Sequence, residues 1–333
     1  MARKHGFSLH TSILIPAIVM ALLISCSEKK YPDMYNYSLS LGNTHWSGIM
    51  HDNKANRKRS GSGFNPLTNN LYPGINLFRD NFVGLNFEHI MNGAAADSDI
   101  CMFTPRNDSC YVRQYSDSSA SIVHKARNSS WNTDSELRYT LSGEHYIDLE
   151  FKVTLKKDVF PLGYIAFMWA SYMNHTFDRR IFFPGSEGAE EKWISFGEDS
   201  VNGFETGTIA YIGTDHLPYE EGTKLLNIVE HQKKKFTLPL YYGLVHGSGQ
   251  LDNQTDTMVY IMMFDQKKPI RFAMWNFIRN QEGFPDIHSP AWDWQYVIRE
   301  PKINKEYGYR ARVVYKPFAG RNDVIEEYDT WKR

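Results

Sequence analysis

The segment WASYMNHTFDRR, residues 169–180, follows an apolar run and carries side chains that can bind a sugar or move a proton. Polar residues at a strand end lie where loops form ligand sites. His175 can exchange a proton near neutral pH, and Tyr172 can serve as an acid or base beside cations. Trp169 offers a ring that could stack on a sugar. The alternative for Tyr172 and Trp169 is packing in the core.

Two adjacent arginines end this segment. Arg179 and Arg180 could hold a carboxylate or a sulfate, because the guanidinium fork matches planar oxyanions. If both lie on one strand, only one of them faces the site. The alternative is that they pair with Asp178 or Glu187, in which case their charges serve the fold.

Two further histidines lie next to predicted strands. His246 ends the strand-like part of YYGLVHGSG beside a glycine turn, and Tyr242 precedes it as a candidate for substrate binding. Flexible glycines beside a strand-end histidine leave room for a ligand, so His246 is the first choice for a catalytic group. His89, in GLNFEHI, is expected to point inward with Phe87, opposite Glu88. It is a further catalytic candidate, with a hydrogen-bonded core histidine as the alternative.

The segments IRFAMWNF and WDWQYVIRE supply the last candidates. Arg271 could bind a substrate carboxylate, and Trp292 could form a platform for a sugar ring. Alternation sets Trp292, Trp294 and Tyr296 on one face of a strand and the polar residues between them on the other. One of these faces must be core, so packing is the alternative for the tryptophans.

Together these residues fit acid–base chemistry on sugars. Removing a ring proton next to a carboxylate requires a base, a cation for the carboxylate and an acid for the leaving oxygen. We assign His246 or His175 as the base, Tyr172 as the acid and the arginines to the carboxylate. The chain has no P-loop, dinucleotide-binding glycine pattern, GxSxG elbow or HExxH motif, which are the usual signatures of other chemistries. We predict no cofactor and no metal.

The elements that must position these residues are strands. The segment YIDLEFKVTL, from Tyr146, alternates apolar with polar residues, as half-buried antiparallel strands do. Similar segments recur between Gly, Pro, Asn and Asp turns, without long helices between them. The sequence therefore predicts an all-β fold, a large antiparallel two-sheet sandwich. One short C-terminal helix is expected, capped by Asn322 or Asp323 with Val324 on its apolar face, and the polar stretch 43–70 is expected to be a long loop.

The first residues predict export. Basic residues precede an apolar run that ends in LISC, a sequence similar to the lipobox of bacterial lipoproteins. Residues 1–26 are thus expected to be a signal peptide, with Cys26 acylated as an anchor on the periplasmic or cell-surface side of a membrane. We expect residues 27–40 to form a tether and residues 41–333 a single β-sandwich domain. The alternative is an ordinary signal peptide with a chance cysteine.

Composition narrows the range of partners. The formal net charge is −1, with 37 basic and 38 acidic residues, so no basic excess indicates nucleic acid. Aromatic residues make up 14% of the chain, including 20 Tyr and 8 Trp, and such rings stack on sugars. An oligosaccharide is therefore the expected partner. Cys101 and Cys110 could form a small disulfide in an oxidising compartment or remain thiols.

Several segments carry a resemblance to known proteins: GLNFEHI, FTPR, YIDLEFKVT, MWASYMNH, FDQKKPIRFA, PAWDWQYVI and YGYRARVVYKPF. They resemble exported bacterial proteins from polysaccharide-degradation loci, and with the lipobox they resemble lipoproteins of marine Bacteroidetes. These proteins look similar to the galactose-mutarotase-like β-supersandwich, which mutarotases, sugar-binding domains and several polysaccharide lyases and dehydratases share. The resemblance implies a large twisted sandwich with its site in a concave face or cleft. It carries over no catalytic residue.

Three functions remain open at this point. The first, which we favour, is a lyase or dehydratase that acts on uronate-containing oligosaccharides by proton abstraction and β-elimination. The second is a lipoprotein that binds glycans without chemistry. The third is a sugar epimerase or a glycoside hydrolase on the same scaffold, of which a hydrolase needs two carboxylates at a suitable separation. The catalytic readings require distant histidine, tyrosine and arginine side chains to converge in one pocket.

Overall fold

The computed structural model describes residues 32–55, 61–97, 104–188, 190–197, 205–223, 228–247, 257–278, 281, 283 and 286–333. All of these residues belong to one compact unit that begins at residue 31. The predicted signal peptide with Cys26, and Cys101 of the candidate disulfide, lie outside the described residues. No helix of the described part is long and apolar enough to cross a membrane.

Three antiparallel sheets account for the strands that the structure describes. The largest has 11 strands in the order β1 (Asp33–Met34), β6 (Cys110–Ser116), β7 (Ser119–His124), β8 (Thr133–Ser142), β9 (Tyr146–Leu155), β19 (Glu306–Pro317), β16 (Thr257–Phe264), β15 (Leu240–His246), β11 (Ile181–Glu187) and β12 (Glu190–Phe196), with β14 (Lys234–Phe236) paired to β11. The second has five strands in the order β13 (Gly207–Ala210), β17 (Ile270–Trp275), β18 (Ala291–Arg299), β10 (Tyr164–Ala170) and β5 (Asn86–Met91). The third contains β2 (Ser38–Gly42), β3 (Trp46–His51) and β4 (Gly63–Asn69).

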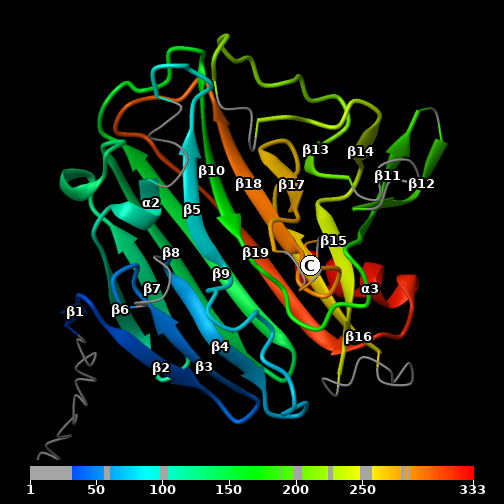
Figure 1. Ribbon diagram of the computed structural model, residues 1–333. Helices are drawn as coiled ribbons and strands as arrows, with labels where there is room; N and C mark the ends of the chain where they lie inside the picture. The colour runs from blue at the N-terminus through cyan, green and yellow to red at the C-terminus, as the bar shows by residue number, and fades with distance from the viewer. Residues whose placement is uncertain are drawn as a thin grey trace, which may run out of the picture. The chain divides into compact units, whose positions relative to one another are not determined.

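The five-stranded sheet packs against the largest sheet, with the three-stranded sheet at one end, as Figure 1 shows. Short helical segments lie outside the sheets: α2 (Thr104–Asn107), the 3-10 turn η1 (Ala126–Asn128) and the C-terminal helix α3 (Arg321–Lys332). The prediction of an all-β antiparallel two-sheet sandwich with a short C-terminal helix is confirmed.

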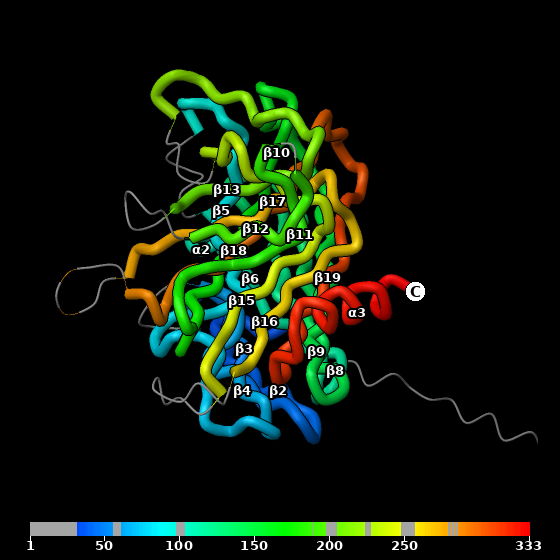
Figure 2. Tube along the Cα trace, turned by 90° about the vertical axis from the view of Figure 1, so that its right-hand side faces the viewer, coloured from blue at the N-terminus to red at the C-terminus, as the bar shows by residue number. Residues whose placement is uncertain are grey.

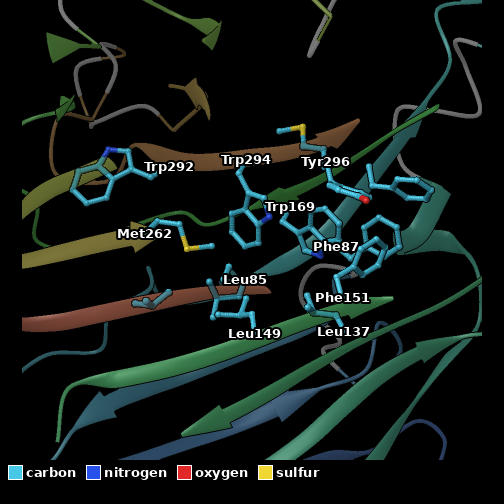
Figure 3. Close-up of a cluster of buried hydrophobic side chains, with 14 of the residues drawn as sticks. Leu85, Phe87, Leu137, Leu149, Phe151, Trp169, Met262, Trp292, Trp294 and Tyr296 are labelled. Carbon is cyan, nitrogen blue, oxygen red and sulfur yellow. The ribbon is translucent and has the colours of Figure 1, made fainter. Parts of the chain in front are cut away.

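Aromatic side chains fill the space between the two larger sheets (Figure 3). Trp169 and Trp294 stack with their ring centroids 5.5 Å apart, and Phe151 from β9 meets Trp169 edge-on at 4.7 Å. Strand alternation explains the arrangement, because every second residue of β9 and β18 faces the opposite sheet. Burying each such ring stabilises the fold by roughly 1.5–3 kcal/mol.

Residues predicted as tether or loop form strands instead. In the predicted tether 27–40, Asp33 pairs with Arg113 of β6 and Ser38 with His51 of β3. The predicted loop 43–70 contains β3 and β4. These strands carry polar residues on their solvated face, where Ser47 Oγ and Thr68 Oγ1 lie 2.9 Å apart, so their alternation is hidden by Ser, Thr and Asn, which are typical of loops.

The C-terminal helix packs on the outside of the largest sheet, beside β15 and β16 (Figure 2). Val324 is fully buried against Leu240, Val259 and other apolar residues of these strands, which matches the apolar face predicted for this helix. The predicted caps were wrong: Gly320 is the N-cap, with φ 106°, and no side chain caps the helix. A glycine takes this positive φ without the steric cost that a side chain would add.

Candidate functional site

Four chain segments meet at one end of the sandwich, beyond the end of β10 and the beginning of β18. Residues 171–177 continue β10 and lie beside residues 286–290, because Met173 N donates to Pro290 O at 2.9 Å and Thr176 N to His288 O at 3.3 Å. On the other side, Asn174 N donates to Leu77 O at 3.0 Å. The predicted segment WASYMNHTFDRR therefore lies between two loops.

The same segment also touches the largest sheet at β15. His246 N donates to His175 O at 2.9 Å, and Phe177 N donates to Leu244 O at 3.0 Å. The His246 ring stacks on the Phe177 ring with centroids 3.7 Å apart. These contacts bring together three histidines from three segments, His175, His246 and His288, which we call the histidine cluster.

His175 is half-buried, and its imidazole lies near other titratable groups. Burial lowers its pKa below the ordinary 6.5, the nearby His246 and His288 lower it further, and Asp80 acts in the opposite direction. Its backbone φ is 54°, which is uncommon for a residue with a side chain and is found often where a site holds the chain in place. At neutral pH this imidazole is therefore uncharged and able to accept a proton.

His288 has a defined hydrogen-bonding state. Its Nδ1 lies 2.6 Å from Thr176 O, and because a carbonyl oxygen only accepts, Nδ1 must carry the hydrogen. Proton exchange at His288 is thus left to Nε2. Thr176 Oγ1 also donates to Ile287 O at 2.8 Å, which holds the two segments in register beside the cluster.

An ion pair supports the loop that carries His288. Arg79 pairs with Asp286 and donates to Ser289 Oγ at 2.6 Å, while His288 N donates to Asp286 Oδ1 at 3.0 Å. Burial alone would raise the pKa of Asp286, but the hydrogen bond and charge of Arg79 outweigh it and lower that pKa. This carboxylate stays ionised and positions the His288 backbone.

Of the predicted catalytic residues, the structure brings three to this end of the sandwich. His175 and His246 belong to the cluster, and Tyr172 lies beside it, since Arg79 N donates to Tyr172 O at 3.0 Å. The Tyr172 side chain is buried against Phe82, with ring centroids 4.6 Å apart, so the packing alternative describes its position.

His89 lies elsewhere. It is buried in the middle of β5, opposite Met168 of β10, whereas His175 follows the end of β10. The register between β5 and β10 shifts between Met168 and Trp169, where His89 pairs with Met168 and Phe87 with Trp169. Its neighbour Glu88 forms a buried ion pair with Arg106 at 2.8 Å.

The three aromatic residues predicted to bind substrate are parts of the packed interior. Trp169 and Trp292 are fully buried between the sheets, and a Cβ at Gly243 would lie 2.0 Å from the Trp292 ring, which shows how closely that ring sits on β15. Tyr242 packs on Phe182 beneath the C-terminal helix. None of the three offers a ring face to a sugar, because close packing already uses those faces.

The predicted substrate-binding arginines are also separated. Arg180 donates to Asp178 at 2.9 Å, as the alternative reading anticipated. Arg271 is buried on β17 and pairs with Glu230 at 3.2 Å. Burial lowers the pKa of Arg271 to about 10, with Glu230 opposing the shift. Arg179 is half-buried, and its carbonyl oxygen accepts the Trp292 indole hydrogen at 3.0 Å.

Three further features of the site were not predicted from the sequence: His288, Asp80 and the Arg79–Asp286 pair. His288 had a local signal, because it lies two residues before the recognised strand segment PAWDWQYVI and follows Asp286 in a turn. Asp80 and Arg79 had none, since their loop joins the site through contacts with residues distant in sequence, such as the hydrogen bond of Asn174 N to Leu77 O and the ion pair of Arg79 with Asp286. Among the described residues, no group of three or more His, Cys, Asp or Glu side chains could hold a metal ion.

Comparison with solved structures gives neighbours over most of the chain. A candidate aldose 1-epimerase from Escherichia coli K12 is 10% identical, covers 85% of this chain and 99% of its own, and has a TM-score of 0.46. A galactose mutarotase-like protein from Lactobacillus casei is 10% identical over 84% of this chain and 100% of its own, with a TM-score of 0.45. A galactose 1-epimerase from Lactobacillus acidophilus is 10% identical over 86% and 97%, with a TM-score of 0.43.

Two of these neighbours are named as 1-epimerases and one as a galactose mutarotase-like protein. At such identities and TM-scores they say nothing about the activity or the site residues of this chain. No protein family and no curated protein sequence matches it.

Proposed function

We propose that the histidine cluster catalyses 1-epimerisation of a neutral reducing sugar. The observation that supports this most strongly is the meeting of His175, His246 and His288 at one end of the sandwich. His246 N donates to His175 O at 2.9 Å, and His288 Nδ1 donates to the carbonyl oxygen of the next residue, Thr176, at 2.6 Å. An imidazole held neutral beside one that can donate a proton supplies a base and an acid to the same small ligand. A sugar is the substrate class that the aromatic composition and the sequence resemblance favour.

In this reaction the two imidazoles act on the two oxygen atoms bonded to C1. His175, as a neutral imidazole, removes the proton from the hydroxyl group on C1. His288, as an imidazolium with a hydrogen on each ring nitrogen, gives its Nε2 proton to the ring oxygen as the bond from C1 to that oxygen breaks, and it becomes neutral while His175 becomes the imidazolium. The product is the open-chain aldehyde. Rotation about C1–C2 presents the other face of the carbonyl, and the reversed proton transfers close the ring as the other anomer. No atom is gained or lost, and no oxidant is required.

The arginines favour this reaction over β-elimination from a uronate. Elimination also needs a cation that neutralises the substrate carboxylate. Of the arginines predicted to bind a substrate carboxylate, Arg180 and Arg271 pair with carboxylates of the protein, namely Asp178 and Glu230. Epimerisation at C1 needs no such cation. The sugar epimerase alternative therefore fits the site better than the lyase reading.

Polarimetry tests the proposal. Fresh solutions of single anomers of neutral aldoses should reach equilibrium faster with catalytic amounts of the protein than without it. His288→Gln should remove most of the acceleration, whereas His45→Gln, on the three-stranded sheet side of the molecule, should leave it unchanged. No acceleration with any aldose, together with ultraviolet-absorbing unsaturated products from uronate-containing oligosaccharides, would contradict the proposal and restore the lyase reading.

A further inference from the structure

The chain that leaves β17 lies beside the histidine cluster and is not used by the proposed reaction. Trp275 pairs with Ala291 of β18, and Ala291 in turn bridges to Tyr172. Asp286 N donates to Ile278 O at 2.9 Å, so the two arms of this hairpin remain paired beyond the ends of β17 and β18. Residues 276 and 277 therefore lie across from the stretch that carries His288.

The buried amide of Asn276 is unsatisfied. The residue is only 6% exposed, and neither Nδ2 nor Oδ1 has a hydrogen-bond partner among the residues that the structure describes. The indole Nε1 of the adjacent Trp275 is in the same state. Each such buried group is destabilising, because it has lost its hydrogen bonds to water without gaining others, and native proteins keep few of them. Three unsatisfied polar atoms on two consecutive residues indicate a place where a ligand supplies the missing hydrogen bonds.

An exposed aromatic ring stands next to this amide. Phe277 is 53% exposed, and its ring lies nearly parallel to that of Trp275, with an angle of 11° and centroids 5.9 Å apart. Trp275 is itself largely buried and so fixes the orientation of the outer ring. A large apolar ring that is exposed to solvent and held in one orientation is suited to stacking on the apolar face of a sugar.

We infer that Asn276 and Phe277 form a subsite for a neutral pyranose with two adjacent hydroxyl groups. The ring of Phe277 stacks on the sugar, while Asn276 Nδ2 donates to one hydroxyl and Asn276 Oδ1 accepts from its neighbour, since a primary amide presents a donor and an acceptor side by side. None of these side chains is charged, which selects a neutral sugar over a uronate. Because the amide atoms lie below the surface, binding includes a local shift of the chain around residue 277.

The inference rests on the proposed function for its catalytic context, because it assigns the substrate class of the same site. It also explains why the pair lies on the hairpin that carries His288. A sugar that is bound by Asn276 and Phe277, on the arm that follows β17, has its neighbouring ring or its own C1 directed towards the arm that precedes β18. That arm carries His288, where the proton transfers take place.

Methyl glycosides of neutral pyranoses separate binding from turnover, because a methyl group on the C1 oxygen prevents ring opening. Their binding to the wild-type chain is measured by calorimetry, together with the melting temperature of each variant. We expect Phe277→Ala to weaken binding about ten-fold with an unchanged melting temperature. Asn276→Leu should weaken binding at least ten-fold and leave the melting temperature unchanged or higher, because it removes an unsatisfied buried amide. Ile303→Ala, which trims another exposed apolar residue, should alter neither quantity.

The inference is overturned if no methyl glycoside binds, or if both variants bind like the wild type. It is also overturned if Asn276→Leu lowers the melting temperature by several degrees while binding is retained, since the amide would then serve the fold. Glycoside binding with the expected losses, but without mutarotation by the wild-type chain, would contradict the proposed function and leave this subsite standing.

Discussion

The strands β10 and β18 and the loops beyond their ends serve opposite purposes. Within the strands, Trp169, Trp292 and Trp294 are fully buried, and Trp294 Nε1 donates to Tyr309 OH at 2.7 Å. In the loops beyond the strand ends, His175 and His288 are half-buried, and Asn276, which follows the neighbouring strand β17, has an unsatisfied amide. The packed aromatic layer fixes the positions of the strands. The loops that follow or precede these strands carry histidines and an unsatisfied amide, which lower the stability of the fold but can bind a ligand or transfer a proton.

The largest effect should come from the base. His175→Gln should lower the rate of mutarotation about 10²- to 10⁴-fold, the usual contribution of a positioned acid–base group. Its free energy of unfolding should change little, because the residue is half-buried on a loop. Polarimetry and urea unfolding of the same preparation measure both quantities. If His175→Gln lowered the free energy of unfolding but kept the mutarotation rate, His175 would serve the fold and not the reaction, contrary to this prediction.

The packed layer should respond in the opposite way. Trp292→Ala should lower the free energy of unfolding by about 3–5 kcal/mol, because it leaves a cavity between β18 and β15. The protein that remains folded should retain its mutarotation rate to within a few-fold. Denaturant unfolding measures the loss. A change below about 1 kcal/mol would mean that the ring is less tightly packed than its contact with Gly243 indicates.

His124, a buried histidine of the packed region, should make the free energy of unfolding depend on pH. Burial lowers the pKa of His124 to about 4, although its hydrogen bond to Pro105 O opposes the shift. As pH falls below 6.5, the unfolded chain binds a proton at this residue before the folded chain does. The stability present above pH 6.5 is therefore lost progressively towards pH 4, by about 3 kcal/mol. His124→Gln should flatten this part of the stability profile, as measured by urea unfolding from pH 7 to pH 4. An unchanged slope would count against this assignment.

The smallest effect is expected for Tyr242. Its hydroxyl accepts from Arg321 Nε at 3.3 Å under the C-terminal helix, far along β15 from the cluster. Tyr242→Phe should cost less than about 1 kcal/mol of stability and leave sugar binding unchanged. A clear loss of sugar binding, measured by calorimetry, would show that Tyr242 takes part in substrate binding after all.

Most of the long strands could be predicted from local sequence patterns. The alternation in YIDLEFKVTL and WDWQYV predicts β9 and β18, because side-chain direction in a strand depends only on parity. The strands β2 to β4 were missed, since their residues resemble loops in composition and their pairing is a long-range property. The same limit applied to Trp169 and Trp292, whose burial depends on the sheet that packs against them.

The site was only partly accessible from sequence. His175, His246 and Tyr172 were predicted to share one region, and they do, because each lies at or beyond the end of a recognisable strand. His288 and Asp80 enter through hairpin and loop pairings that no local pattern shows. The arginines were assigned to a substrate carboxylate, but nearby carboxylates such as Asp178 and Glu230 occupy two of them.

The titration of the three imidazoles by NMR tests the central claim most directly, because it needs no substrate. The account predicts that His175 titrates below 6.5 in the wild-type chain, and that His288→Gln raises this pKa by removing a neighbouring positive charge. A His175 that titrates at or above 6.5, with a pKa unaffected by the loss of His288, would show that the histidines do not act on one another and would contradict the account.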